Sequence, residues 1–573
     1  MDLTPQAITI LEKRYLKRDT GGKIIESPEE MFWRVARNIA EPEHLYGSRT
    51  SPEELSEIFF KMMSSLDFLP NSPCLMNAGR ELQQLAACFV LPVEDSLDAI
   101  FETVKQTALI HQSGGGTGFS FSRLRPKDDA VQSTGGVASG PTSFMRVFNM
   151  ATEVIKQGGT RRGANMGVLR VDHPDIMEFI AIKQSPGEME NFNLSIGLTK
   201  PFMEALERDA EYGLINPRTK EEAKRLRAKD VFEAMVSAAW ETGDPGILFL
   251  DRINEANPTP QLGEIESTNP CGEVPLLSYE PCVLGSINLS HMLREKDGKW
   301  EVDFDKIRQT VRHAVHFLDN VIDMNQYPLP QIAQMAKGNR KIGLGVMGLA
   351  DFFIRLGIPY NSLKALEVSR GVMSFIQHQA RERSMELAEE RGVFPNFLSS
   401  IYDKSGMRLR NATVTTIAPT GTLSLIANCS SGIEPLFAVQ YTRRAFDDVE
   451  FQILDPLFAE FGEREKFLNP DVLRYISEGT SLRDLPQIPQ RIRELFITTF
   501  EISPAWHIKI QAVFQEYTDN AVSKTINFPR DATKGDVREA FLMAYRERCK
   551  GITIYRSGSK ARQVLACGTK QVC

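Results

Sequence analysis

Several features that define other protein classes are missing from this sequence. Its eight cysteines are scattered over 573 residues, which excludes a disulfide-stapled secreted scaffold and paired CxxC zinc ligands. Acidic residues outnumber basic ones by 74 to 67, so there is no basic field to hold a nucleic-acid backbone. The N-terminus lacks a signal-peptide layout, and no apolar run reaches the roughly 18 residues of a membrane span. We therefore expect a cytoplasmic protein with neither nucleic acid nor membrane as partner.

The order of helix and strand patterns predicts a small helical region followed by one large α/β domain. Short β-rich runs such as Cys88 to Leu91 and Thr413 to Ala418 alternate with amphipathic helices between residues 71 and 550, as in a mainly parallel fold. No linker, repeat or low-complexity tract divides this stretch. Residues 551–573 are polar, and we expect a flexible tail there. Residues 1–70 have apolar positions at helical spacing, namely Phe32, Val35, Ala36 and Ile39.

The ends of two helices can be read from the sequence. Asp95-Ser96 can cap a helix that stops before Gly114-Gly115-Gly116, and Pro141 opens a second helix that ends at Gly158-Gly159. The expected apolar faces are Leu97, Ile100, Val104 and Ala108 in the first helix, and Phe144, Val147, Ala151, Val154 and Ile155 in the second.

The segment Asn269-Pro270-Cys271-Gly272-Glu273 combines an amide, a thiol and a carboxylate within five residues. Its proline and glycine force an irregular backbone that can direct all three groups to one point. A thiol can give or take a hydrogen atom, Glu273 can act as a general base toward a hydroxyl, and Asn269 can orient that hydroxyl. A loop with a buried structural cysteine explains the spacing equally well.

Two other cysteines can reach the same place. Cys282 follows a short return strand, and Cys88 lies on a separate predicted strand far upstream. A pair able to close into a disulfide beside a third thiol is a two-electron reductant next to a one-electron site. From these residues alone, a structural role for Cys88 and Cys282 stays favoured.

A phosphate site without lysine or arginine is possible after the predicted strand Thr413 to Ala418. The run Pro419-Thr420-Gly421-Thr422-Leu423-Ser424 turns into the next helix, where small residues expose backbone N–H groups. A plain helix cap explains this run about as well.

Four motifs, in order along the chain, together resemble the catalytic chain of ribonucleotide reductase, and the resemblance extends from about Met31 to Arg556. Any one of them alone would be a modest hint. The motifs are Asn269 to Glu273, Cys282 to Leu289, Asn339 to Val346 and Pro419 to Thr422.

The resemblance implies a fold and a reaction. The fold is an α/β barrel of ten strands in two five-stranded halves, with Cys271 on a central finger loop, where burial protects a radical from water and oxidants. Cys271 would carry a thiyl radical that abstracts the ribose 3′ hydrogen. Glu273 would take the 3′ hydroxyl proton, Asn269 would bind the sugar, and Cys88 with Cys282 would supply the reducing equivalents and end as a disulfide.

The resemblance also implies two nucleotide sites. Substrate phosphates would lie on Pro419, Thr420, Gly421, Thr422, Leu423 and Ser424, with Ser72, Ala87 and Gly116 lining the rest of the pocket. Many family members have serine where this chain has Ala87, so that contact passes to the backbone. A deoxynucleotide effector would meet Asp95, Ser96, Leu97 and Arg125, and the loop Lys156 to Asn165 with Arg161 would relay base identity. A solvated charge pair is the alternative for Arg161-Arg162.

The source of the radical is a separate question. No Tyr-Tyr pair occurs, unlike in the aerobic two-subunit reductases, and the C-terminal region around Gly558 does not match the glycyl-radical kind. The chain instead resembles the adenosylcobalamin-dependent class. It lacks an Asp-x-His-x-x-Gly signature, so the cobalt should keep its own lower base and no protein metal ligand is expected. The segments that resemble this class are Ser120, Asn191 to Asn193, Ser430 to Phe437 and Thr525 to Pro529.

Further expectations concern partners. The substrates would be ribonucleoside diphosphates, the effectors dNTPs, the reductant thioredoxin or a similar protein, and the assembly a homodimer joined through the effector helices. The chain begins at the helical region, which leaves no room for an ATP cone. Cys567 and Cys573 would form a mobile shuttle that re-reduces the buried pair, although family tails usually end in a closer pair.

Two alternatives stay open. One is a class I-type large subunit that receives its radical from a separate metal-bearing subunit. The other is a catalytically inactive homologue that only senses dNTPs. Retention of Cys88, Asn269, Cys271, Glu273 and Cys282 argues against the second, because a sensor has no need of all five.

Overall fold

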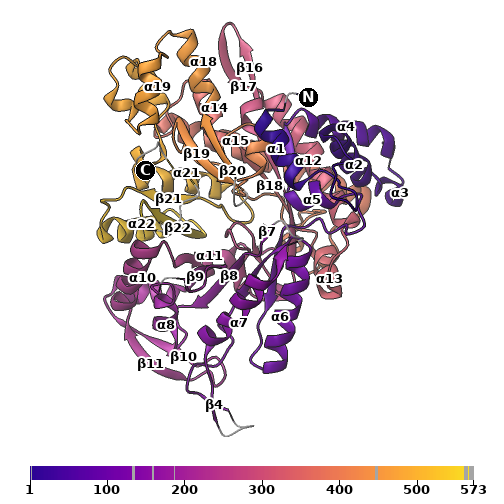
Figure 1. Ribbon diagram of the computed structural model, residues 1–573. Coiled ribbons are helices and arrows are strands. Elements are labelled where there is room, and N and C mark those ends of the chain that lie inside the picture. Colours follow the sequence, from indigo (N-terminus) through magenta and orange to yellow (C-terminus); the bar gives the residue numbers. More distant parts are fainter. Residues whose placement is uncertain are drawn as a thin grey trace.

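The computed structural model describes most of the chain (Figure 1). The described residues are 1, 3–48, 50–131, 136–157, 161–185, 187–445, 449–559 and 565–566. Within these ranges no helix combines the length and the apolar character needed to cross a bilayer.

Four helices form the N-terminal region: α1 (Pro5–Arg14), α2 (Pro28–Ala40), α3 (Glu43–Tyr46) and α4 (Pro52–Ser64). Thr4, Ser27 and Ser51 each precede a proline and accept a hydrogen bond from a backbone N–H in the first helical turn. Each hydroxyl satisfies a donor that the helix leaves open, and each proline has the φ of a first helical residue. The apolar face of α2 is fully buried, as predicted, at Phe32, Val35, Ala36 and Ile39.

A ten-stranded sheet forms the centre of the molecule. One set of parallel strands consists of β2 (Cys88–Pro92), β3 (Gly116–Ser120), β8 (Asn165–Arg170), β9 (Phe192–Leu198) and β12 (Gly246–Phe249). A second set contains β15 (Pro281–Asn288), β18 (Ile342–Met347), β21 (Thr525–Phe528) and β22 (Gly551–Arg556), and β1 (Phe68–Pro70) pairs with β15. The two sets meet in antiparallel pairs at both edges, β15 with β2 and β22 with β12.

Residues 413–418 complete the second set, although not as the continuous strand that their alternation predicts. Only two isolated parallel bridges are present, from Thr415 to Leu344 and from Ile417 to Val522. The side chain of Asp519 accepts the Val414 N–H at 2.8 Å, and the Thr415 hydroxyl accepts the Asp519 N–H at 2.9 Å. The Asp519 carboxylate thus takes the Val414 N–H, a backbone group that a continuous strand would pair with its neighbour. The segment lies between β18 and β21, so the predicted barrel of two five-membered halves is confirmed.

Helices cover the outside of the barrel. On the second half, α12 (Phe304–Met324) packs against β15, β18 and α15 (Leu363–Arg391), and α15 packs against α21 (Pro504–Glu516). On the first half, α10 (Ala228–Thr242) packs against α22 (Lys534–Arg546). A smaller apolar core lies beneath α18 (Pro456–Arg464), α19 (Pro470–Ser477) and α20 (Gln490–Leu495). Further helices are α5 (Ser72–Asn77), α8 (Ile176–Ala181), α9 (Lys200–Glu207), α11 (Leu250–Glu255), α13 (Pro330–Asn339), α14 (Leu349–Leu356) and α16 (Ile401–Ser405).

Two helices begin at the predicted residues, but the second ends at Val154, before the predicted Gly158-Gly159, and both have different buried faces from those expected. In α6 (Leu97–Gln112), Ser96 caps the first turn as predicted, yet Leu97 is 63% exposed. The buried side of α6 contains Ile100, Thr103, Thr107 and Ile110. In α7 (Pro141–Val154), the buried residues are Pro141, Thr142, Met145, Phe148 and Thr152, while Val154 is 74% exposed. Both helices have apolar residues on two sides, so the sequence pattern does not decide which side faces the barrel.

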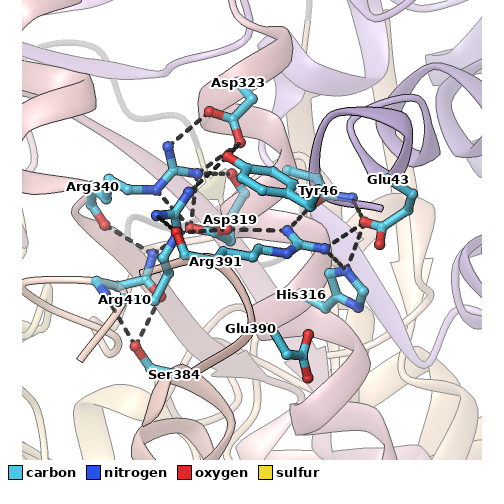
Figure 2. Close-up of polar contacts among 12 residues, drawn as sticks. Glu43, Tyr46, His316, Asp319, Asp323, Arg340, Ser384, Glu390, Arg391 and Arg410 are labelled. Atoms are coloured by element: carbon cyan, nitrogen blue, oxygen red, sulfur yellow. Dashed lines mark hydrogen bonds and ion pairs between the residues drawn. The ribbon is translucent and has the colours of Figure 1, made fainter. Parts of the chain in front are cut away.

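A buried network of charged side chains joins the N-terminal helices to the barrel (Figure 2). Arg391, the last residue of α15, donates to Glu43 of α3 at 2.6 Å and to Asp319 of α12 at 3.3 Å. Arg340 donates to the same Asp319 at 2.9 Å, and His316 bonds Glu43 at 2.8 Å. Burial of these groups is tolerated because each charge faces an opposite charge at hydrogen-bond distance.

Candidate active site

A short hairpin carries the predicted finger loop into the barrel. It is formed by β13 (Ser267–Thr268) and β14 (Pro275–Leu276), and β13 packs against β2, β3 and β8. A Cβ atom on Gly118 would lie 1.7 Å from the Thr268 carbonyl oxygen, and one on Gly116 would lie 3.0 Å from Pro270. Only glycine at these β3 positions lets the hairpin approach so closely.

The loop also contacts the second half of the barrel. The carbonyl of Glu273 accepts hydrogen bonds from the Thr416 hydroxyl at 2.8 Å and from the Ala521 N–H at 2.9 Å. Gly272 has a φ of 81°, in the left-handed region. The loop between β13 and β14 therefore spans the barrel interior, as the resemblance implied.

The thiol side chain of Cys271 is exposed, which corrects the expected burial. Its neighbours Asn269 and Glu273 are only 2% exposed. Cys271 lies in the turn at the tip of the loop and lines a cavity of about 630 Å³. The loop is inside the barrel, but its tip faces open space rather than packed side chains.

Cys88 and Cys282 face each other across the antiparallel pair of β2 and β15. Directly opposed residues have Cα atoms about 4.5–5.5 Å apart, within the range that a disulfide spans. The amide of Asn269 donates to the Cys88 sulfur at 3.2 Å. Burial raises the pKa of both thiols, and the nearby Glu273 carboxyl group adds to the effect at Cys88. The structure thus brings all five predicted catalytic residues together, with the two opposed thiols protonated.

Burial raises the pKa of Glu273 to about 7, although a hydrogen bond with Asn269 opposes the shift. Its Oε2 atom is buried and accepts no hydrogen bond from any residue that the structure describes. A carboxyl group with a pKa near 7 and a vacant acceptor suits proton exchange with a substrate hydroxyl.

The predicted phosphate residues divide into two groups. Pro419, Gly421 and Ser424 line the same cavity as Cys271. Thr420 is turned into the protein, where its hydroxyl accepts the Gly432 N–H at 2.8 Å. Thr422 directly precedes the four-residue helix α17 (Leu423–Ile426), and Leu423, its first residue, is buried.

The three remaining predicted substrate residues are not among those that line this cavity. Ser72 is buried at the start of α5, and its hydroxyl bonds the Tyr15 hydroxyl at 2.7 Å. The Ala87 carbonyl accepts the Gly116 N–H at 2.9 Å. Ala87 and Gly116 thus lie side by side behind the finger loop.

The predicted effector residues lie at the start of α6. Asp95 accepts two hydrogen bonds from Arg125, one from the backbone N–H at 3.1 Å and one from the guanidinium at 2.8 Å. Lys156 and Arg161 belong to a small hairpin of β6 (Lys156–Gln157) and β7 (Arg161–Arg162) that contacts α6. Residues 158–160 and the predicted tail cysteines, Cys567 and Cys573, lie outside the described residues.

Three polar residues of the cavity were given no role by the sequence. Asn193 of β9 donates to the Pro270 carbonyl at 2.7 Å and so holds the loop next to Cys271. Lys524 is fully buried and pairs with Glu434. Gln6 of α1 reaches the cavity from the N-terminal region. The amide-rich run around Asn193 is the only one of these with a local signal, since the other two depend on distant parts of the chain.

The cavity offers space and polar groups but no metal-binding cluster within the described part of the chain. No three histidine, cysteine or acidic side chains converge there in the manner of metal ligands. Its lining near Cys271 combines Asn193 and Ser195 with apolar surface from residues such as Phe437 and Phe500. A large organic cofactor that brings its own metal ligands fits such a surface.

Comparisons with known proteins agree with this geometry. The family model for the ribonucleotide reductase barrel domain matches residues 86–408 and 403–555, and the all-alpha domain model matches residues 1–83. A vitamin B12-dependent ribonucleoside-diphosphate reductase of Thermoplasma acidophilum is 49% identical over all of this chain and 81% of the relative. One of Mycobacterium tuberculosis is 47% identical over 99% of this chain and 81% of the relative.

A solved structure has the same fold. The alpha subunit of a class Id ribonucleotide reductase from Actinobacillus ureae superposes with a TM-score of 0.79 over 97% of both chains, at 22% identity. The family models cover most of the chain, and two relatives are nearly half identical to it in sequence. The chain therefore belongs to the ribonucleotide reductase family, as a catalytic chain.

Proposed function

We propose that this chain reduces ribonucleoside diphosphates to 2′-deoxyribonucleotides through a thiyl radical on Cys271, with adenosylcobalamin as cofactor. The observation that carries the proposal is the cavity in which Cys271 is exposed while Glu273, Asn269, Cys88 and Cys282 are buried around its loop. The similarity to B12-dependent diphosphate reductases supports both the substrate class and the cofactor.

Each step of the proposed reaction uses a group of the finger loop or of the opposed thiols. The Cys271 sulfur radical abstracts the 3′ hydrogen atom, and the Glu273 carboxylate takes the 3′ hydroxyl proton. The 2′ hydroxyl leaves as water. Cys88 and Cys282 together give two electrons and two protons and become a disulfide, after which Cys271 returns the hydrogen atom to C3′. The protonated state of the opposed thiols suits them as hydrogen donors.

The residues around the cavity fit the proposed cofactor. When bound, adenosylcobalamin supplies a carbon-centred radical by homolysis of its carbon–cobalt bond. Asn193 and Ser195 would bind its polar edge, and Phe437 with Phe500 would cover its apolar surface. Asn193 would at the same time keep Cys271 in reach through its bond to Pro270.

Neither alternative is favoured. A class I-type large subunit would need a partner for its radical, and the two relatives near half identity are named as B12-dependent enzymes instead. An inactive dNTP sensor would not need a carboxyl group with a pKa near 7 beside a hydrogen-bonded cysteine.

Effector binding, dimer formation and re-reduction are further parts of the proposal. The contact between α6 and the β6–β7 hairpin supports a dNTP site at Asp95 and Arg125. The outward apolar side chains of α6 and α7 support a homodimer through these helices. Thioredoxin or a similar protein would re-reduce the buried pair by way of Cys567 and Cys573, because a protein-sized reductant cannot reach two buried thiols.

The decisive test is Cys271→Ser, assayed with a ribonucleoside diphosphate, a dithiol and adenosylcobalamin but no second protein. We expect the wild type to reduce the substrate, and the variant to bind nucleotide normally without reducing it, because an alcohol O–H bond is too strong for hydrogen-atom exchange. Cys549→Ser is the matched control, since Cys549 is buried outside the site. Turnover by Cys271→Ser would refute the radical assignment, and wild-type activity independent of the cofactor would refute the cofactor.

A further inference from the structure

Helix α1 places a polar side chain in the catalytic cavity. In Figure 1, α1 lies nearer the centre of the molecule than α2, α3 and α4, and it packs against α17. Gln6 of α1 lines the cavity together with Gly421 and Ser424. Its Nε2 atom is buried and donates to no acceptor among the residues that the structure describes. A buried amide donor without an acceptor is costly, so a ligand is the natural source of the missing acceptor.

Contacts at both ends of α1 hold Gln6 in this position. At the N-terminus, the Thr4 hydroxyl accepts the Ala7 N–H at 3.1 Å and caps the helix. At the other end, the fully buried Tyr15 bonds Ser72 of α5 at 2.7 Å. Gln6 is the second residue of α1, next to the positive end of the helix dipole, where an anion is favoured.

The charged side chains around the cavity indicate whether charged or neutral donors would bind an anion there. Among its described lining residues, Lys524 is the only lysine or arginine. The Lys524 ammonium is already bonded to Glu434, His507 and Thr525, which uses all three of its protons. Phosphates in this cavity therefore depend on neutral donors. Ser424 and Ser431 line it and bond each other at 2.9 Å, so together they offer one further hydroxyl proton.

We propose that the side-chain amide of Gln6 donates a hydrogen bond to a phosphate of the ribonucleoside diphosphate substrate. The inference rests on the proposed function and extends the phosphate site from the 419–424 turn to the N-terminal helical region. Gln6 is then a specificity-determining residue that recognises the phosphates of the substrate and takes no part in the chemistry at the ribose.

The test compares Gln6→Met and Gln6→Glu with the wild type, both close to glutamine in size. For Gln6→Met we expect KM for CDP to rise about tenfold, the effect of losing one hydrogen bond to a charged group, with kcat within about twofold. Gln6→Glu should raise KM further, because a carboxylate repels phosphate. The Ki of cytidine, which lacks phosphates, should not change. Gln331→Met is the matched control, since Gln331 also follows a proline at the second position of a helix and is exposed.

Each outcome decides a different question. A wild type that reduces CDP, with an unchanged KM in Gln6→Met, overturns the inference and leaves the proposed function standing. Equal losses for CDP and cytidine also overturn it, because they indicate a general distortion of α1. A wild type that reduces no CDP refutes the proposed function. In that case, calorimetric binding of CDP to wild type and Gln6→Met still decides whether Gln6 binds the phosphates.

Discussion

At the residue scale, Asn269 connects the finger loop to the opposed thiols. Its side-chain oxygen accepts the Val274 N–H at 3.0 Å, which closes the loop, and its nitrogen donates to Cys88 at 3.2 Å. The same amide stabilises the ionised form of Glu273, but burial of the carboxyl group has the larger effect on its pKa. Local polar contacts therefore fix the geometry of the finger loop. Burial of Glu273 determines the protonation state of its carboxyl group.

Glu273→Gln should remove activity and stabilise the fold. The pKa of Glu273 is raised from 4.5 to about 7 in the folded chain. The folded state therefore loses stability, relative to the unfolded chain, as the pH rises from about 4.5 to 7. Glutamine has no proton to lose, so the variant should be more stable by roughly 3 kcal/mol above pH 7 and equal to the wild type below about pH 4.5. Denaturant unfolding at several pH values measures this difference.

The activity of the wild type should show the same titration. We expect kcat/KM to rise with pH through about 7, because the ionised carboxyl group is the base. Glu389→Gln, an exposed change on α15, should alter neither profile. A pH-independent stability difference for Glu273→Gln would show that Glu273 is not the raised carboxyl group.

At the scale of single elements, α6 and α7 have more apolar side chains than the barrel can cover. Leu97, Phe101 and Leu109 of α6 are 63%, 53% and 39% exposed, and Met150 and Val154 of α7 are 63% and 74% exposed. Helices that pack against each other and share an outward apolar surface are typical of a subunit interface.

Phe101→Asp should convert a homodimer into monomers. A buried carboxylate without a partner opposes association, so sedimentation velocity at micromolar concentration with dTTP should show a monomer for the variant and a dimer for the wild type. Leu363→Asp, on a residue that is 76% exposed at the start of α15, is the matched control and should stay dimeric. A monomeric wild type with effector bound would contradict the proposed interface.

At the scale of the whole molecule, buried charged side chains fix α3 to the barrel, beside the apolar contacts that α2 and α4 make with α12. The side chains of Glu43, Asp319 and Arg391 are at most 1% exposed, and they come from α3, α12 and α15 (Figure 2). Burial would raise the pKa of Asp319, but Arg340, Arg410 and Arg391 lower it below its ordinary value. Asp319 therefore stays ionised and depends on these arginines.

Arg391→Leu should destabilise the whole chain. It leaves Glu43 and part of Asp319 buried without their partner, which costs about 3–5 kcal/mol in comparable buried pairs. Thermal unfolding should show a lower Tm. Arg227→Leu breaks the surface pair with Asp209, whose side chains are about half exposed, and should leave Tm unchanged. Equal Tm values for the two variants would mean that the network does not stabilise the attachment of the N-terminal region to the barrel.

The sequence by itself determined the features that depend on neighbours along the chain. The helix ends at Ser96 and Pro141 and the composition of the finger loop follow from local chemistry. Four motifs in order identified the family and, with it, the barrel and the five residues at its centre. No distance between separate segments was needed for these conclusions.

Only the tertiary structure decided which side of α6 and α7 is buried. It also decided that Cys271 and Gln6 both line the cavity. It also replaced the expected strand at residues 413–418 with two isolated bridges, because Asp519, about a hundred residues later, takes the Val414 N–H. These outcomes depend on contacts between residues far apart in the chain. Local periodicity cannot specify such contacts, because burial is a property of the assembled barrel and not of any one segment.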